Sequence, residues 1–235
     1  MSETSVTRLP LPAPETPAPS AGRASTRRKR SGAWSVTGLL LLSLVPVVAG
    51  AARLTELSIG AGVTPANARF FEAPVPVVLH IIGATVFSVL GAFQFVPSLR
   101  RRRWHRMAGR VVLPAGLVAA LTGLWMTVFS ELPTMDGEAL LVLRLVFGTA
   151  MAASLVMAFV AIRRGDVRTH SAWMTRGYAI GLGAGTQVFT HLPWVLLLGA
   201  PDETTRAVLM GAGWVINLAV AELLILRRRA AARLS

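Results

Sequence analysis

The sequence contains no cysteine among its 235 residues. This absence excludes disulfides, thiolate metal sites, iron–sulfur clusters and cysteine nucleophiles. Charged residues are scarce, at 15% of the chain, whereas 53% of the residues are hydrophobic. The hydrophobic residues occur in long blocks and not in an alternating pattern. These features are typical of a polytopic membrane protein.

Lysine is almost absent. Lys29 is the single lysine, and the other 23 basic residues counted as Lys or Arg are arginines. In a soluble protein, a net charge of +13 would suggest a nucleic acid as the partner. Here the basic residues lie in the N-terminal tail and in alternate loops, and no basic stripe is interleaved with stacking aromatics. The charge distribution therefore indicates membrane topology, and we expect no nucleic-acid partner.

The most basic segment, Arg100 to Arg110, has six arginines and one histidine in eleven residues. Each arginine would cost roughly 2.5–3.5 kcal/mol at the centre of a bilayer. We therefore expect this segment to be a loop at a membrane face. Because short loops rich in Arg and Lys stay in the cytoplasm, that face is expected to be cytoplasmic.

Six apolar runs are long enough to cross a bilayer as helices. They predict an all-α, polytopic bundle of six transmembrane helices with both termini cytoplasmic. The expected spans are 34–52, 74–97, 111–130, 140–162, 177–199 and 207–226. All strongly basic segments then lie on one side and all acidic ones on the other, as expected of a multi-pass protein of the inner (plasma) membrane surrounded by the lipid bilayer.

The chain is expected to have three parts. Residues 1–32, proline-rich and then basic, are predicted to be a disordered cytoplasmic tail. Residues 33–229 form the transmembrane domain, with core helices at about 74–199, and residues 230–235 form a short cytoplasmic tail. Glycines spaced by four in the fifth span predict a close helix contact and a central position for that span. These glycines are Gly177, Gly181 and Gly185.

Four histidines are the candidates for chemistry. Counted from the outer boundary at 1.5 Å per residue, His80 lies about 9 Å deep and His191 about 12 Å deep. Histidine inside a membrane indicates a functional site, and a pair at matched depth could ligate the iron of one haem b. The alternative is that each only forms a hydrogen bond between helices. His105 and His170 form an inner pair, either as ligands or as imidazoles at the lipid headgroups.

Arginines near these histidines could clamp haem propionates, because guanidinium binds carboxylate in a bidentate fork. On the cytoplasmic side the candidates are Arg106, Arg110 and Arg176, with membrane topology as the alternative explanation. Arg144 lies on the acidic side, where topology does not require it. It is expected to bind either an outer propionate or the acidic loop at Asp136 and Glu138.

Several short motifs resemble a known family. They are His80, the segment Gly91-Ala92-Phe93-Gln94-Phe95, Trp104-His105-Arg106 with Gly109-Arg110, and Arg168-Thr169-His170 with Trp173-Met174 and Arg176. Over roughly residues 75–200 the chain resembles the predicted prokaryotic membrane proteins of domain-of-unknown-function family 2306. This resemblance implies a membrane fold and family membership, and it implies no activity.

A looser likeness is to the ascorbate-reducing transmembrane cytochromes b, which hold two haems between four core helices by four histidines. It implies haem b and a quinone or another redox partner. His170 and His191 would lie about 31 Å apart along one helix, which is long for two haems in a core about 30 Å thick. One outer haem ligated by His80 and His191 is therefore the form of this hypothesis that we carry forward.

The sequence thus leaves two function classes. The first is a haem b transmembrane electron carrier. The second is a membrane protein without a cofactor, either a small-solute permease or a partner-binding subunit. An intramembrane hydrolase is disfavoured, because no Asp or Glu is expected in the membrane core near a histidine.

Overall fold

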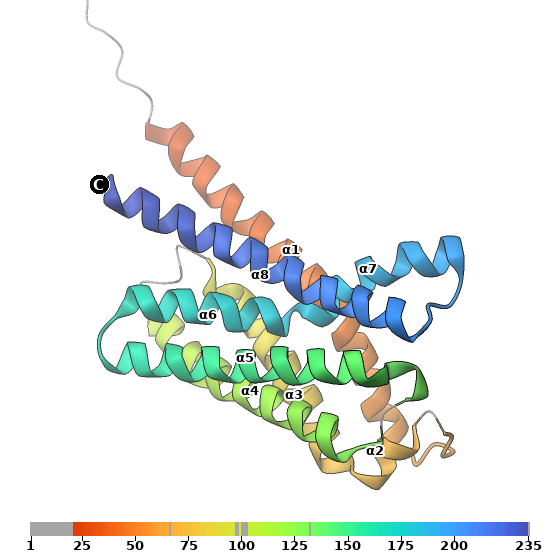
Figure 1. Cartoon of the computed structure of the whole chain (residues 1–235). Coiled ribbons are helices and arrows are strands. Elements are labelled where there is room, and N and C mark those ends of the chain that lie inside the picture. Colours follow the sequence, from red (N-terminus) through yellow and green to blue (C-terminus); the bar gives the residue numbers. More distant parts are fainter. Residues whose placement is uncertain (1–20, 66, 97–98, 100–102, 132, 235) are drawn as a thin grey trace, which may run out of the picture.

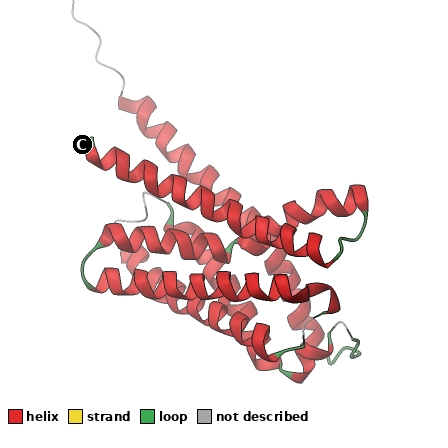
Figure 2. Ribbon diagram, in the orientation of Figure 1, coloured by secondary structure: helices red, strands yellow, loops and turns green. Residues whose placement is uncertain are grey.

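All regular structure in the part of the chain that the structure describes is helical, which confirms the predicted all-α class (Figure 2). The computed structural model describes residues 21–65, 67–96, 99, 103–131 and 133–234. The helices are α1 (Ala21–Ser58), α2 (Ala68–Glu72), α3 (Pro74–Gln94), α4 (Arg103–Phe129), η1 (Thr134–Asp136), α5 (Gly137–Arg163), α6 (Val167–Gly181), α7 (Gly183–Leu198) and α8 (Glu203–Arg233).

Five helical stretches among the described residues are long and apolar enough to cross a membrane. They are Val36–Ser58, Pro74–Gln94, Arg103–Phe129, Gly137–Arg163 and Glu203–Arg233. Each overlaps one of the expected spans. The expected fifth span, 177–199, is instead divided between α6, with 15 residues, and α7, with 16 residues. Neither helix alone has the length of a typical span.

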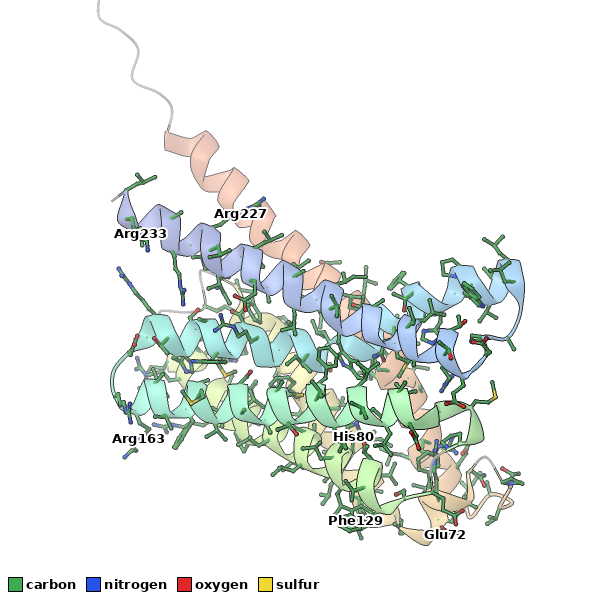
Figure 3. The ribbon with its side chains drawn as sticks, in the orientation of Figure 1. Glu72, His80, Phe129, Arg163, Arg227 and Arg233 are labelled. Atoms are coloured by element: carbon green, nitrogen blue, oxygen red, sulfur yellow. The ribbon has the colours of Figure 1, made fainter. Side chains whose placement is uncertain are left out.

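The long helices run back and forth along one axis (Figure 1). Helix α3 packs mainly on α4 and α1, α5 packs on α4 and α6, and α8 packs on α7, α6 and α5. Arg163, Arg227 and Arg233 lie at one end of the bundle, which we call the basic end (Figure 3). The opposite end carries α2, η1 and the first turns of α3, α5 and α8, and we call it the Asp136 end.

The core lies where α3, α5 and α6 meet. Phe87 of α3 and Leu155 of α5 are almost fully buried there, beside Tyr178 of α6. The Tyr178 hydroxyl donates a hydrogen bond to the Ser88 carbonyl at 2.6 Å. A Cβ atom at Gly91 would lie 2.4 Å from the Tyr178 ring, so only glycine admits this ring against α3. The glycine of the Gly-Ala-Phe-Gln-Phe segment thus has a packing role.

Several helices extend further than expected. Residues 103–110 form the first turns of α4 and are not a loop, and Arg100 to Arg102 lie outside the described residues. Helix α1 begins at Ala21, inside the expected disordered tail. Residues 1–20 of that tail lie outside the described residues. At the other terminus, α8 continues to Arg233. Charge sets the depth of a segment in the membrane but does not end a helix, because arginine and alanine are good helix formers.

Candidate functional site

The α6–α7 segment breaks at Leu182, between Gly181 and Gly183, and α7 then continues at an angle to α6 (Figure 1). Asn217 of α8 bridges this break. Its Nδ2 donates to the Ala179 carbonyl at 3.0 Å, and its Oδ1 accepts a hydrogen bond from the Thr186 hydroxyl at 2.8 Å. One side chain therefore provides hydrogen bonds to both halves of the broken helix. Irregular backbone at membrane depth requires such partners.

Helix α7 is held by polar contacts to α8 as well. Gln187 donates from Nε2 to the Met210 carbonyl at 3.1 Å, and Thr190 donates to the Leu209 carbonyl at 2.8 Å. The two α8 carbonyls already accept hydrogen bonds within their own helix. The bonds from Gln187 and Thr190 therefore strengthen the contact between α7 and α8 and do not complete the backbone hydrogen bonds of α8. They fix the position of α7 relative to α8.

The predicted glycine contact is distributed over three neighbours. Gly177 and Gly181 lie on α6, against the side chains of Leu155 and Phe87. Gly185 lies on α7, where a Cβ atom would be 2.0 Å from the Leu42 carbonyl oxygen of α1. Of these three glycines, Gly185 is the one that brings two helix backbones together. Helix α6 is central as predicted, whereas the second half of α7 is largely exposed, and the glycines do not form one stripe on one helix.

A pocket of about 400 Å³ lies beside the break, between α1, α3, α4 and α5. Its apolar wall includes Phe87, Leu124, Met151, Leu182 and Trp214. Polar side chains from several helices also line it: Ser43, His80, Thr85, Ser88, Thr127 and Gln187. Toward the Asp136 end it is lined by Arg69 and Arg144. Such a concave, mostly apolar site with a few convergent polar groups is typical of small-molecule binding.

Asp136 is the centre of an ion-pair network at this end of the bundle. Its side chain is 1% exposed, and its Oδ2 lies 2.8 Å from Nη2 of Arg144 on α5. Its Oδ1 accepts a hydrogen bond from Nε of Arg206 on α8, also at 2.8 Å. Burial opposes ionisation, but the hydrogen bonds and charges of the two arginines hold the pKa of Asp136 below its ordinary value. The predicted contact of Arg144 with the acidic loop is thus confirmed.

Arg69 of α2 has no comparable partner. Its Nε is buried and has no hydrogen-bond partner among the described residues. Its guanidinium lies 4.6 Å from the centroid of the Phe70 ring, and that of Arg53 lies 4.3 Å from the same centroid. Arg53 is paired with Glu56. Burial lowers the pKa of Arg69, which is opposed by the charge of Asp136.

His80 and His191 do not line the same pocket. His80 lines the pocket described above, with Nδ1 2.8 Å from the Ala119 carbonyl oxygen (Figure 3). His191 is not part of that lining, and its Nδ1 lies 2.7 Å from the Gln187 carbonyl oxygen of its own helix. Its Nε2 is buried without a hydrogen-bond partner in the described part of the chain. Helix α7 packs on α8 and α1, whereas α3 packs on α4 and α1.

The inner histidines lie near the basic end. His105 is half-buried in the first turn of α4, and His170 is half-buried in the first turn of α6. Nδ1 of His170 lies 2.9 Å from the Ala158 carbonyl oxygen of α5. His170 and His191 are on two helices separated by the break at Leu182, so the expectation of a single helix carrying both is wrong. Within the described ranges, no group of three or more His, Asp or Glu residues could hold a metal ion.

The cytoplasmic-side arginines differ in their surroundings. Arg106 and Arg110 are exposed on α4. Arg176 forms a bidentate pair with Glu222 of α8, with Nε–Oε1 at 2.5 Å and Nη2–Oε2 at 2.9 Å, and its guanidinium lies 4.6 Å from the centroid of the Trp173 ring. Arg176 therefore already has a carboxylate partner and links α6 to α8.

Sequence reasoning missed Arg69 and Arg206. The signal for the two arginines was available, because both lie in segments where the topology does not require a basic residue. The same argument had singled out Arg144. Asn217, a lone amide in an apolar span, is predicted from the sequence to form a contact between helices, and its bonds to Thr186 and Ala179 confirm this.

The fold and site define a polytopic helical membrane protein with a pocket inside its bundle. A family model of predicted membrane proteins, DUF2306, matches residues 77–225, which is more than half of the chain. The chain belongs to this family, as the motifs had suggested. The match includes the pocket residues on α3, α4 and α5, the α6–α7 break and most of α8. No curated protein and no solved structure matches the chain significantly.

Proposed function

We propose that this chain is a multi-pass membrane protein that binds a small solute in the pocket beside the α6–α7 break, as a permease does. The observation that carries the proposal is the pocket of about 400 Å³ at a broken helix. In transporters, discontinuous helices form substrate sites because their free backbone ends lie in a cavity. The polar side chains on the pocket wall, which are costly at membrane depth without a function, support the same interpretation.

The proposal includes a topology. Helices α6 and α7 together form a sixth crossing, and the basic end faces the cytoplasm at the plasma (inner) membrane. The position of Arg163, Arg227 and Arg233 at one end supports this orientation by the positive-inside rule (Figure 3). A reporter that is active only in the cytoplasm is expected to be active when fused after Arg233 and inactive when fused after Glu138. The opposite pattern would refute the topology.

Filling the pocket tests the binding function. Ala84 lines the pocket on α3, whereas Ile82 on the same helix is 50% exposed and does not line it. Calorimetric titration of 1-octanol into the full chain in lipid nanodiscs, corrected with empty nanodiscs, is expected to detect saturable binding. Ala84→Phe is expected to abolish that binding, and the matched control Ile82→Phe to retain it. Equal heats from the two variants would show that the pocket is not the binding site.

A haem b electron carrier with a quinone or other redox partner remains the second candidate. It is favoured by the position of His80 in the same pocket as Arg69 and Arg144, which suit propionates. Because His191 does not line this pocket, the pocket supports His80 and not His191 as a haem ligand. An absorption spectrum of protein purified from haem-replete cells is the test. A Soret band that is lost in His80→Ala supports this candidate, and a colourless wild-type protein excludes it.

A further inference from the structure

We propose that the solute is an amphiphilic carboxylate, with its head group between Arg69 and Arg144 and its apolar body in the pocket beside Phe87 and Met151. This inference rests on the proposed binding function and adds the charge and class of the ligand. The two arginines come from different helices, α2 and α5, and line the same pocket. A ligand carboxylate would therefore join two elements that belong to separate parts of the chain.

The pairing of charges at the Asp136 end leaves one guanidinium available. Asp136 uses one carboxylate oxygen for Arg144 and the other for Arg206. Glu56 serves Arg53. Within the described ranges no carboxylate lies within salt-bridge distance of Arg69, although its Nε is buried. Arg69 is half-buried, and the charge of Asp136 acts on it without a direct ion pair. A carboxylate is the planar anion whose two oxygens match the donors of such a guanidinium.

The remainder of the pocket selects an apolar body. Below the arginines the wall includes Leu124, Leu182 and Trp214, and its polar groups are hydroxyls, one amide and the His80 imidazole. The volume of about 400 Å³ is near the lower end of the roughly 300–1,000 Å³ of small-molecule sites. It suits one short chain or ring, and a phospholipid with two acyl chains is too large. We therefore assign the site to a single-chain carboxylate and not to a lipid headgroup.

The experiment compares a charged probe with an uncharged one of the same chain length. Octanoate and 1-octanol are titrated calorimetrically at pH 7.5 into the full chain in phosphatidylcholine nanodiscs. The wild-type protein is expected to bind octanoate at least about tenfold more tightly than 1-octanol. Arg69→Gln is expected to remove this preference by weakening octanoate alone. Arg53→Gln is the matched control, because Arg53 contacts the same Phe70 ring but does not line the pocket.

The outcomes separate this inference from the proposed function. Equal affinity of the wild-type protein for octanoate and 1-octanol would overturn the carboxylate inference and leave the pocket standing, and this comparison does not depend on a folded variant. Equal loss of octanoate binding in Arg53→Gln and Arg69→Gln would also overturn it. Abolition of octanoate binding by phosphatidylglycerol in the nanodisc would assign the site to a lipid headgroup. Failure of both probes would refute the proposed function itself.

Discussion

Replacing Asp136 by Asn tests whether the buried ion-pair network holds the Asp136 end of the bundle together. The substitution keeps the shape of the side chain and one carbonyl oxygen, but it removes the charge that two guanidinium groups share. Breaking a buried ion pair from one side costs about 3–5 kcal/mol. The side chains of Arg144 and Arg206 are 21% and 34% exposed, so solvent screens part of the charge that is left. We therefore expect Asp136→Asn to lower the free energy of unfolding by about 2–4 kcal/mol.

The loss is measurable as a lower melting temperature of the purified protein. For a chain of this size, about 3 kcal/mol corresponds to a shift on the order of 10 °C. Asp202→Asn is the matched control, because Asp202 caps the start of α8 by accepting from the Thr205 N–H at 2.8 Å. Asparagine caps a helix about as well as aspartate, so this control is expected to change stability little. If Asp136→Asn melted at the same temperature as Asp202→Asn, the network would not stabilise the bundle.

The same network predicts a pH dependence. Because the pKa of Asp136 is lower in the folded protein than its ordinary value, the carboxylate stabilises the fold above about pH 4. That contribution is lost as the pH falls through the folded pKa. The difference in stability between the wild-type protein and Asp136→Asn should therefore be constant from pH 7 to pH 5 and decrease below about pH 4. A difference that grows on acidification would contradict the assigned direction.

Two further substitutions test the broken helix. Asn217→Leu removes both hydrogen bonds that bridge the break and is expected to lower the free energy of unfolding by about 1–3 kcal/mol. The melting temperature in detergent measures this loss. An unchanged melting temperature would mean that the break does not need the bonds from Asn217. Gly185→Ala places a methyl group against the Leu42 carbonyl and is expected to lower stability strongly, whereas Gly109→Ala, with no neighbouring atom within 4 Å, is expected to be neutral or to stabilise by up to about 1 kcal/mol. Similar melting temperatures for the two alanine variants would refute the close approach of α7 and α1.

Hydropathy and charge were sufficient to predict the helical class and the approximate positions of five spans, and they named Asp136 as one of two alternative partners of Arg144. These features depend on the composition of single segments, and this composition can be read directly from the sequence. Helix ends were predicted less well. At residues 103–110 the high charge was interpreted as a loop, but arginine is a good helix former, and Gly109 does not interrupt α4.

The break at Leu182 and the pocket were not predictable in the same way. An apolar run that contains Gly181, Gly183 and Gly185 reads as a continuous span, because hydropathy does not report the direction of the helix axis. The break is bridged by Asn217, which lies on another helix and donates to the Ala179 carbonyl while accepting from the Thr186 hydroxyl. Pockets likewise depend on which segments meet. The sequence could therefore mark Arg69 as a basic residue that the topology does not require, but it could not show that Arg69 lines a pocket.

The division of α6 from α7 also bears on how the chain is inserted during synthesis. On the proposed topology, the translocon receives five segments that it can release into lipid one by one. The α6–α7 segment carries Arg168 and Arg176 in α6, and neither of its helices is long and apolar enough to cross the membrane alone. Arg176 is neutralised by Glu222 and the break is bridged by Asn217, and both partners are on α8. The segment therefore becomes a stable membrane element only after α8 has left the ribosome, so that the last two crossings enter the bilayer as one unit.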